Sequence, residues 1–352
     1  MDKSVKDVVD SVVESFNKEF KDNTAQTLDS DSILCKINDW VPTGSMAIDK
    51  VIRGGYPKPR PIIPFGRLTE ISGLNGSGKT TMLGHIGAQI QAAGGFVCIA
   101  DTEHALDVKY MESLGLDLSR VILFQPDCLE DFFDKLSHLL TTIQKAAPDK
   151  LVGVFLDSVG ATSTRAELSG KGGGMAEAAR VWGSELRNHV ALISKLKTAL
   201  IFTNHMYYNV GDVYGDKYKT YGGEKIKYLA TLRLRLTQKA KITIGPKEDK
   251  ETIGREIEIT TIKNKMQPGE KKVRGYVLFG HGFSNDYLVF KTADKLEGTE
   301  GGGEFKSSTW STWKTPTGEE VKFQGWHGFL AKVVTHKDYP SLLMAVEDTF
   351  YS

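Results

Sequence analysis

A glycine-rich segment that could bind phosphate occupies residues 73–81 and has the form G-x-x-x-x-G-K-[ST]. The pattern predicts a strand before it, at residues 67–72, and a helix after it, from Thr80 to Ala93. In that setting, backbone N–H groups close around phosphate oxygens, and the helix N-terminus adds partial positive charge. Lys79 would reach the β- and γ-phosphates, and the Thr80 hydroxyl would ligate Mg²⁺. The residues expected to bind a nucleoside triphosphate are Gly73, Leu74, Asn75, Gly76, Ser77, Gly78, Lys79 and Thr80.

Two carboxylates are expected near this loop. Asp157 ends the apolar run 151–156, and the carboxyl end of a buried strand faces the crevice where ligands bind in open α/β sheets. Asp157 would hold the water shell of Mg²⁺. Many ATPases have Glu directly after this Asp, but here the next residue is Ser158. Glu103, just beyond an expected strand at 96–101, is therefore the candidate base that orients the attacking water, with helix capping as the alternative.

The elements that must position these residues follow an α/β pattern. From about residue 34 to residue 280, strand-like and helix-like segments alternate, which predicts a mostly parallel sheet covered by helices. After residue 229, strictly alternating segments predict half-exposed antiparallel strands. The first group of expected strands is 68–72, 96–101, 121–124, 151–157 and 199–204, the clearest helix is 129–143, and the antiparallel strands are 231–237, 255–262 and 273–279.

Shorter segments flank this core. Residues 4–20 have apolar residues on one helical face, followed by a polar linker at 21–32, and such a helix can dock on a neighbouring molecule. Irregular loops are expected at Pro57–Pro64 and Gly298–Ser308. The last 45 residues suggest a hairpin around Thr317-Gly318 and two short helices. The expected division is an N-terminal helix and linker (1–35), an ATPase core (36–281) and a small α+β C-terminal domain (282–352).

Composition sets broad limits. The 352 residues carry a formal net charge of +1, which argues neither for nor against nucleic acid, because a balanced total can hide a basic surface. The cysteines Cys35, Cys98 and Cys128 are far apart, without metal-type spacing, so reduced thiols are expected. Neither a leader nor an apolar stretch near 18 residues is found, so we expect a cytoplasmic protein without membrane contact.

Several motifs occur in the order and spacing of one family. In these motifs the chain resembles the RecA recombinase family, from about Ile33 to Gly282 and more faintly to the C-terminus. The matching segments are the phosphate loop, 101–107 (Asp-Thr-Glu-His-Ala-Leu-Asp), 156–160 (Leu-Asp-Ser-Val-Gly), 263–265 (Lys-Asn-Lys), 42–49, 125–127 and 222–223. The resemblance implies a DNA-dependent ATPase that forms a helical filament on single-stranded DNA with ATP and Mg²⁺, then pairs it with homologous double-stranded DNA. Mediator and single-strand-binding proteins are possible further partners.

The resemblance also implies roles for further residues. Thr81 would contact the α-phosphate, while Asp107 and Tyr110 would contact the adenine; a structural Tyr on a helix face is the alternative for Tyr110. Lys263 and Lys265 would reach the γ-phosphate held by the adjacent subunit, comparable to an arginine finger. Without the resemblance, a solvated turn would be the favoured interpretation of this Lys pair.

Two segments, 167–176 and 206–223, fall where the family has its DNA-binding loops. The first is a flexible glycine run, and the second mixes tyrosines with lysines and glycines, which suits stacking on bases and contact with phosphates. A loop packed by its own aromatic side chains is the alternative for the second segment. The DNA-binding residues expected here are Lys171, Gly172, Gly173, Gly174, Met175, Arg180, Tyr207, Tyr208, Lys217, Tyr218, Lys219, Tyr221, Gly222 and Gly223.

His205 departs from the bacterial pattern. Bacterial members have Gln at this position, which senses the γ-phosphate and moves the second loop, whereas phage-encoded relatives of the UvsX kind have His. We therefore expect His205 to link the nucleotide to the second loop. The missing acidic tail, together with His205, favours a phage-encoded protein acting in the cytoplasm of an infected bacterial host. Two other classes remain open: a ring-forming helicase, and an ATPase of the same fold that does not act on DNA.

Overall fold

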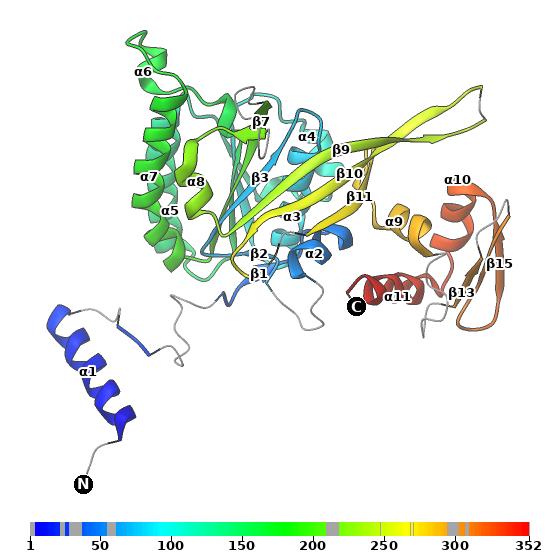
Figure 1. Ribbon diagram of the computed structural model, residues 1–352, viewed down its shortest axis with the longest axis horizontal. Helices are drawn as coiled ribbons and strands as arrows, with labels where there is room; N and C mark the ends of the chain where they lie inside the picture. Colours follow the sequence, from blue (N-terminus) through cyan, green and yellow to red (C-terminus); the bar gives the residue numbers. More distant parts are fainter. Residues whose placement is uncertain are drawn as a thin grey trace.

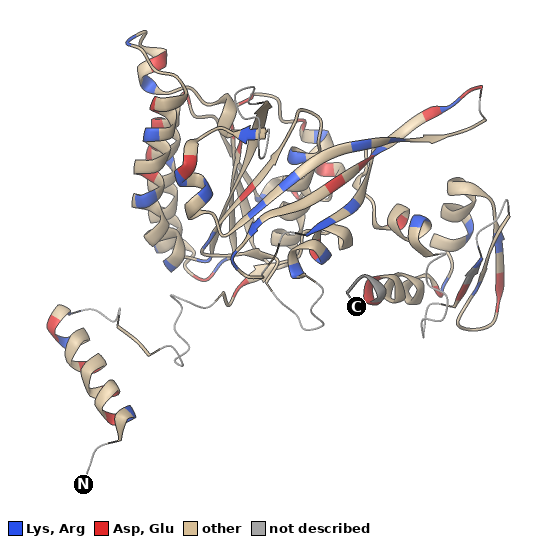
Figure 2. Cartoon of the chain, in the orientation of Figure 1, with Lys and Arg blue, Asp and Glu red and all other residues tan. Residues whose placement is uncertain are grey.

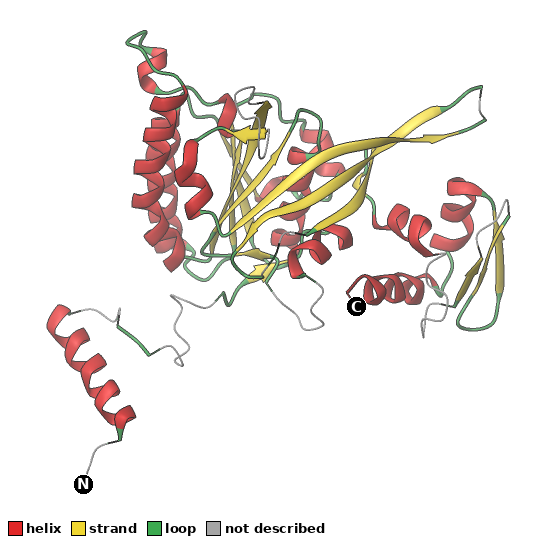
Figure 3. Cartoon of the chain, in the orientation of Figure 1, coloured by secondary structure: helices red, strands yellow, loops and turns green. Residues whose placement is uncertain are grey.

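The computed structural model describes residues 4–21, 25–27, 37–54, 61–208, 218–246, 248–267, 269, 271–293, 303–306 and 310–351. Cys35, Lys217 and most of the expected linker lie outside these residues. Within them, one large sheet forms the centre of the molecule, with helices on both faces and a smaller unit at the C-terminal end (Figures 1 and 3). The predicted α/β class with an antiparallel extension is confirmed.

The large sheet has the strand order β12-β11-β10-β9-β3-β7-β6-β4-β5, and β8 pairs with β7. From β9 to β5 the neighbours run parallel, so their carboxyl ends meet at one edge. The parallel strands are β3 (Leu68–Gly73), β4 (Phe96–Asp101), β5 (Val121–Phe124), β6 (Val152–Asp157) and β7 (Thr198–Tyr208). Strand β9 (Leu232–Ile244) runs parallel to β3 and antiparallel to β10. The remaining strands pair antiparallel and are β8 (Tyr218–Thr220), β10 (Glu251–Asn264), β11 (Lys272–Leu278) and β12 (Gly282–Phe283). All the predicted strands are present.

Successive residues of each parallel strand face opposite sides of the sheet, so both faces are buried. Phe155 and Ile201 pack with helix α3 on one face, while Val154 and Phe202 pack with α5 and α7 on the other. The helices of the core are α2 (Met46–Arg53), α3 (Lys79–Ala92), α4 (Val108–Ser113), α5 (Leu129–Ala146), α6 (Arg165–Leu168), α7 (Met175–Lys195) and α8 (Gly223–Leu229). Short turns of 3-10 helix are η1 (Leu118–Arg120) and η2 (Val159–Ala161).

Strands β9 and β10 continue beyond the core as a twisted two-stranded projection (Figure 1). We call residues 237–244 of β9 and 251–258 of β10 the arm. The ladder between the two strands shifts register between Arg255 and Ile257, an irregularity that increases local twist. Lys and Arg residues recur along these strands (Figure 2).

The C-terminal unit packs against the core through a shared apolar cluster. Trp313, Phe323 and Phe329 are fully buried and share this cluster with Met46 of α2 and Leu278 of β11. The predicted hairpin around Thr317-Gly318 is confirmed as β14–β15. The elements of this unit are α9 (Asn285–Thr292), β13 (Glu304–Lys306), β14 (Ser311–Lys314), β15 (Glu320–Phe323), α10 (Gly325–Phe329), the π-helical turn η4 (Leu330–Val334) and α11 (Tyr339–Tyr351).

Helix α1 (Val5–Phe20) stands apart from the core (Figure 1). Its N-terminus has a capping box between Ser4 and Asp7, which satisfies backbone donors of the first turn. None of the helix is buried, and all its apolar residues except the half-buried Val13 are exposed. The helix predicted for residues 4–20 is therefore confirmed, and its apolar face has no covering partner within the described part of this single chain.

Three segments that were predicted to be loops contain short strands, so the loop prediction was wrong for the residues in those strands. Residues 55–60 lie outside the described residues, but β2 (Ile63–Pro64) pairs with β1 (Trp40–Val41), and Ile63 is fully buried. Within 298–308, Glu304–Lys306 pairs with β14. At 206–223, residues 206–208 pair with 218–220. Glycine and proline content suggested loops, but backbone pairing at the ends of each segment decided the structure.

Candidate nucleotide and DNA site

The phosphate-binding loop joins β3 to α3 at the carboxyl edge of the sheet. Gly76 and Gly78 have φ of +70° and +90°, which only glycine adopts readily. A Cβ on Gly73 would lie 2.7 Å from the Leu236 carbonyl oxygen, so β9 leaves no room for a side chain there. Lys79 donates to the carbonyls of Gly73 and Leu74, each at 3.2 Å. Burial lowers the pKa of Lys79, which Asp157 and Glu103 partly offset.

Asp157 ends β6 beside the first turn of α3. The Thr80 hydroxyl donates to its Oδ2 at 2.6 Å, and the Thr203 hydroxyl of β7 donates to its Oδ1. Burial raises the pKa of Asp157, although these two hydroxyls oppose the shift. A hydroxyl and a carboxylate oxygen in contact are the hard ligands that Mg²⁺ takes when phosphates and water supply the rest. The described residues contain no group of three or more His, Cys, Asp or Glu able to hold a metal by themselves.

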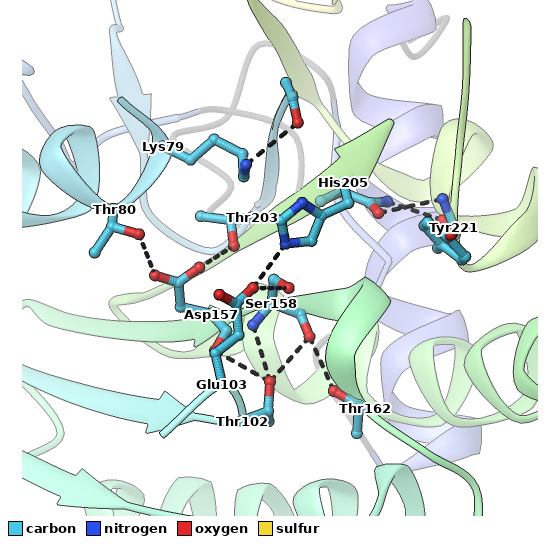
Figure 4. Close-up of polar contacts among 12 residues, drawn as sticks. Lys79, Thr80, Thr102, Glu103, Asp157, Ser158, Thr162, Thr203, His205 and Tyr221 are labelled. Atoms are coloured by element: carbon cyan, nitrogen blue, oxygen red, sulfur yellow. Dashed lines mark hydrogen bonds and ion pairs between the residues drawn. The ribbon is translucent and has the colours of Figure 1, made fainter. Parts of the chain in front are cut away.

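Glu103 follows β4 and faces the same edge as Asp157 (Figure 4). Its Oε1 accepts hydrogen bonds from Ser158 Oγ at 2.6 Å and from His205 Nε2 at 2.7 Å. Burial tends to raise the Glu103 pKa, but these two bonds and the Lys79 charge outweigh it, so the pKa lies below its usual range. The alternative that Glu103 caps the next helix is wrong, because the N-cap of α4 is Asp107. Glu103 is thus an ionised, half-exposed carboxylate.

The residues expected at the adenine lie on α4. Asp107 accepts from the backbone N–H of Tyr110 at 3.0 Å as the helix cap. The Tyr110 hydroxyl lies 2.9 Å from Thr81 Oγ1. Half-burial raises the Tyr110 pKa, and the Thr81 contact opposes that change. Tyr110, Thr81 and Asp107 therefore form one group beside the phosphate-binding loop.

Lys263 and Lys265 lie near the end of β10 and after it, far from the Lys79 loop in sequence. Lys263 Nζ donates to the carbonyls of Lys227 at 2.6 Å and Tyr228 at 2.9 Å, and Lys265 Nζ donates to that of Tyr228 at 3.1 Å. These carbonyls belong to the last turn of α8, where the helix dipole favours cations. Burial, together with the Lys265 and Arg233 charges, lowers the Lys263 pKa to about 8.

The first expected DNA segment is shorter than predicted. Glu167 still belongs to α6 and Met175 begins α7, so residues 169–174 form the loop. The Glu167 carboxylate spans its ends, accepting from the N–H groups of Thr164 and Gly174, each at 2.7 Å. Gly172, Gly173 and Gly174 all have positive φ, and Lys171 is exposed. Arg180, on the exposed side of α7, pairs with Glu177 at 2.7 Å.

The second expected DNA segment is a hairpin at its base. Tyr208 stacks edge-on with Tyr218 across the strands, with 5.8 Å between ring centroids, and Tyr207 pairs with Lys219 in the ladder. Tyr207 and Tyr221 also contact, at 5.1 Å. Gly222 and Gly223 have positive φ and begin α8. The hairpin starts directly after His205, so the residue that contacts Glu103 is continuous with the expected DNA segment.

Three residues of the site were not predicted from the sequence. The Ser158 hydroxyl contacts Glu103. Thr203 binds Asp157 from the neighbouring strand, and Thr102 Oγ1 accepts from the Ser158 N–H at 2.9 Å. A polar residue directly after an apolar run, as Thr203 is after residues 199–202, is the signal that could have identified it.

Comparison with known proteins decides the family. The family model described as RecA N-terminal domain matches residues 7–284. Protein RecA of Thermotoga petrophila is 32% identical over 349 residues, which cover 98% of this chain and 91% of that protein. Protein RecA of Campylobacter lari is 33% identical over 318 residues, covering 89% of this chain and 86% of that protein. The chain belongs to the RecA family.

As a RecA family member, the chain is an ATP-dependent recombinase of DNA repair and a DNA-dependent ATPase. Membership also implies nucleotide binding, single-stranded DNA binding and filament formation. The helicase and the DNA-independent ATPase are therefore set aside. Among the helices that the structure describes, none has the length and apolar character needed to cross a membrane.

Proposed function

We propose that each ATP lies between two protomers of the filament, held by the Lys79 loop of one and by Lys263 and Lys265 of the next. Thr80 and Asp157 would hold Mg²⁺, which would neutralise charge on the β- and γ-phosphates. Glu103 would orient the attacking water. Tyr110, with Asp107, would contact the adenine, and Thr81 the α-phosphate. The observation that supports this nucleotide site is the hydrogen bond from the Thr80 hydroxyl to Asp157 at 2.6 Å, because it brings the end of the phosphate-binding loop and the expected Mg²⁺ carboxylate together.

His205 would act as the link between nucleotide state and DNA binding. Its ring contacts Glu103, and the next residue, Met206, pairs with Thr220 at the start of the β7–β8 hairpin. A phosphate arriving near Glu103 would change the partners of the ring and so bias the hairpin. The expected DNA contacts are those of the two loops, mainly with the phosphate backbone, so affinity would fall steeply with salt.

A His205→Ala variant tests this link. We expect it to bind ATP but to lose most of the ATP-dependent gain in single-strand affinity, measured by fluorescence anisotropy of a labelled oligonucleotide. His327→Ala, an exposed histidine on α10, is the control and should keep the gain. If the His205→Ala protein kept the full ATP-dependent gain in single-strand affinity, the proposed link would be wrong.

The subunit contact would use α1. On edge strand β5, the residues Ile122 and Leu123 are 49% and 47% exposed. A groove of about 510 Å³ runs between β5 and α5 and is lined by Ile122, Phe124, Asp134, Lys135, His138, Leu139 and Thr142. The exposed apolar face of α1 suits this largely apolar groove. We propose that α1 of one protomer docks in the groove of the next.

Some finer features of the proposal concern origin and partners. His205 in place of Gln supports a phage-encoded, UvsX-like protein acting in the cytoplasm of an infected bacterium; the genes flanking its coding sequence test that origin. Mediator proteins would load it on DNA covered by a single-strand-binding protein. Pre-coating DNA with such a protein should delay ATP hydrolysis, and a mediator should remove the delay.

Electron microscopy on circular single-stranded DNA with a slowly hydrolysed ATP analogue tests the assembly. We expect continuous helical filaments that depend on nucleotide, with the nucleotide between subunits. Closed six-membered rings would contradict the filament arrangement. Nucleotide enclosed within one protomer, away from Lys263 and Lys265 of its neighbour, would contradict the shared site while leaving the family assignment untouched.

A further inference from the structure

A side chain of the arm reaches the outer turn of the phosphate-binding loop. Gln238 of β9 donates from Nε2 to the Asn75 carbonyl at 2.9 Å. Gln238 lies two residues beyond Leu236, which pairs with Gly73 at the end of β3. Strand β9 thus continues alongside the loop after β3 has ended, and Gln238 is the residue that reaches across to it.

A second residue fixes which way the Gln238 amide points. Arg255 of β10 donates from its guanidinium to Gln238 Oε1 at 3.1 Å. Arg has only donors, so the oxygen of the Gln238 amide must face Arg255 and the NH₂ must face Asn75. The assignment of the amide oxygen and nitrogen therefore follows from the chemistry of both partners.

Orienting the Asn75 carbonyl also orients the next N–H. The Asn75–Gly76 peptide is trans and planar, so its C=O and N–H point in opposite directions. With the C=O held towards Gln238, the Gly76 N–H points away from the arm. The fit is close: a Cβ on Gly76 would lie 2.8 Å from Gln238 Nε2, and the Gly76 φ is +70°. Backbone N–H groups of such loops are what bind phosphate oxygens.

We propose that Gln238 and Arg255 are positioning residues for ATP binding: Arg255 orients Gln238, and Gln238 holds the Asn75–Gly76 peptide ready for phosphate. The inference rests on the Lys79 loop as the nucleotide site. It makes the arm part of the nucleotide-binding machinery through the backbone of the loop. Anything that changes the pairing of β9 with β10 near Arg255 should therefore change nucleotide affinity.

Four variants and one control test this arrangement on the full-length protein without DNA. Gln238→Leu removes both bonds, whereas Gln238→Glu keeps a partner for Arg255 but cannot donate to the Asn75 carbonyl. Both should weaken binding of a fluorescent ATP analogue roughly 3- to 10-fold, the worth of one hydrogen bond. Arg255→Met should weaken it less, and Arg255→Lys, which keeps a donor, should approach the wild type. Lys145→Met, at an exposed lysine in the last turn of α5, is the control and should leave affinity unchanged.

The double variant Gln238→Leu/Arg255→Met separates a relay from two independent effects. If Arg255 acts only through Gln238, the double variant should bind ATP as Gln238→Leu does. In DNA-stimulated hydrolysis, KM for ATP should rise while kcat stays within about twofold of the wild type. Unchanged affinity in Gln238→Glu, additive losses in the double variant, or a fall in kcat at constant KM would each overturn the proposal. Thermal unfolding of every variant, with Tm near that of the wild type, confirms that affinity is compared between folded proteins.

If the wild type itself bound no ATP analogue, the nucleotide site would be wrong. If the wild type binds and the variants match it, only the role of Gln238 and Arg255 fails. The two failures are therefore distinguishable in the same titration.

Discussion

Two carboxylates of the site have opposite pKa shifts although both face the same edge of the sheet. Burial raises the pKa of Asp157, while Glu103 is less buried and receives two hydrogen bonds that favour its ionised form. An ionised Glu103 at neutral pH can accept a hydrogen bond from water and orient it, as a general base must. The environment of each residue, more than its type, separates the roles that we propose for the two carboxylates.

Glu103→Gln should therefore lower kcat for DNA-stimulated ATP hydrolysis by roughly 10²- to 10⁴-fold while ATP still binds. The amide has nearly the same shape but lacks the negative charge that activates water. Steady-state phosphate release and binding of an ATP analogue measure the two properties. Glu112→Gln, exposed on α4, is the matched control. A Glu103→Gln protein that hydrolyses ATP within tenfold of the wild type would assign the base elsewhere.

Lys263 offers a test by pH. Burial and the neighbouring cations lower its pKa to about 8, so its positive charge is lost as pH rises through that value. In the isolated protein, NMR of ¹³C-labelled lysine should show one Lys titrating near pH 8, a signal that Lys263→Met removes. Lys265→Met should raise that midpoint only partway, because burial remains the larger cause. A titration near the ordinary lysine value would contradict this description of the site.

Among the helices and strands, the sequence predicted the strands that are buried on both faces of the sheet. Strands such as 96–101 and 151–157 are continuous apolar runs, which parallel strands between two helical layers require. It did not predict β8, because Tyr218–Thr220 has no apolar run and exists by pairing with an extension of β7. Strand β13 escaped for the same reason, and β2 escaped because the prolines around Ile63 suggested a loop. A short strand forms because it pairs with a neighbouring strand. When that neighbour is distant in sequence, no local sequence pattern indicates the pairing.

Helix α2 includes a buried acid that should make stability depend on pH. Asp49 accepts from the Thr43 N–H at 2.8 Å and the Thr43 hydroxyl at 2.6 Å. Burial outweighs these bonds and raises the Asp49 pKa from 3.8 to about 6. Because the folded pKa lies above the unfolded one, the contribution of Asp49 to stability is full below about pH 4 and is lost as pH rises to about 6.

Asp49→Asn should remove that slope, which amounts to at most about 3 kcal/mol. Urea unfolding at a series of pH values between 4 and 7 measures it. Asp134→Asn, on the surface of α5, should leave the slope as in the wild type. A slope that persists in Asp49→Asn would mean that another group is responsible.

For the whole molecule, the sequence predicted many of the residues expected at the site. It predicted fewer of the contacts between them. Lys79, Thr80 and Asp157 were expected together from their motifs, and the two bonds between Thr80, Asp157 and Thr203 join three strands or helices. The contact of Glu103 with His205 spans 102 positions and was not expected. Such pairings follow from strand order, which the sequence does not state. The side chain of Gln238 meets the phosphate-binding loop for the same reason.

Removing residues 1–22 should weaken filament growth more than it weakens nucleotide binding. The core elements that bind nucleotide make no use of α1, whose apolar side chains are exposed. Filament length by electron microscopy and binding of an ATP analogue by the monomer measure the two effects. A milder variant, Val12→Ser with Phe16→Ser, removes apolar contact while keeping the chain complete. Equal loss of both properties would refute α1 as the subunit contact.

The exposed face of α1 and the groove beside β5 are two different surfaces. Docking of one in the other has a consequence when intact protein is mixed with protein that lacks α1. A contact between unlike surfaces does not close into a dimer but repeats, giving a polymer with two different ends. A chain lacking α1 still offers its groove, so it can join the end where α1 is displayed, and it then offers nothing to the next arrival. It would act as a terminator at that end alone. Small amounts added to intact protein should therefore shorten filaments out of proportion to their share, and growth at the opposite end should continue.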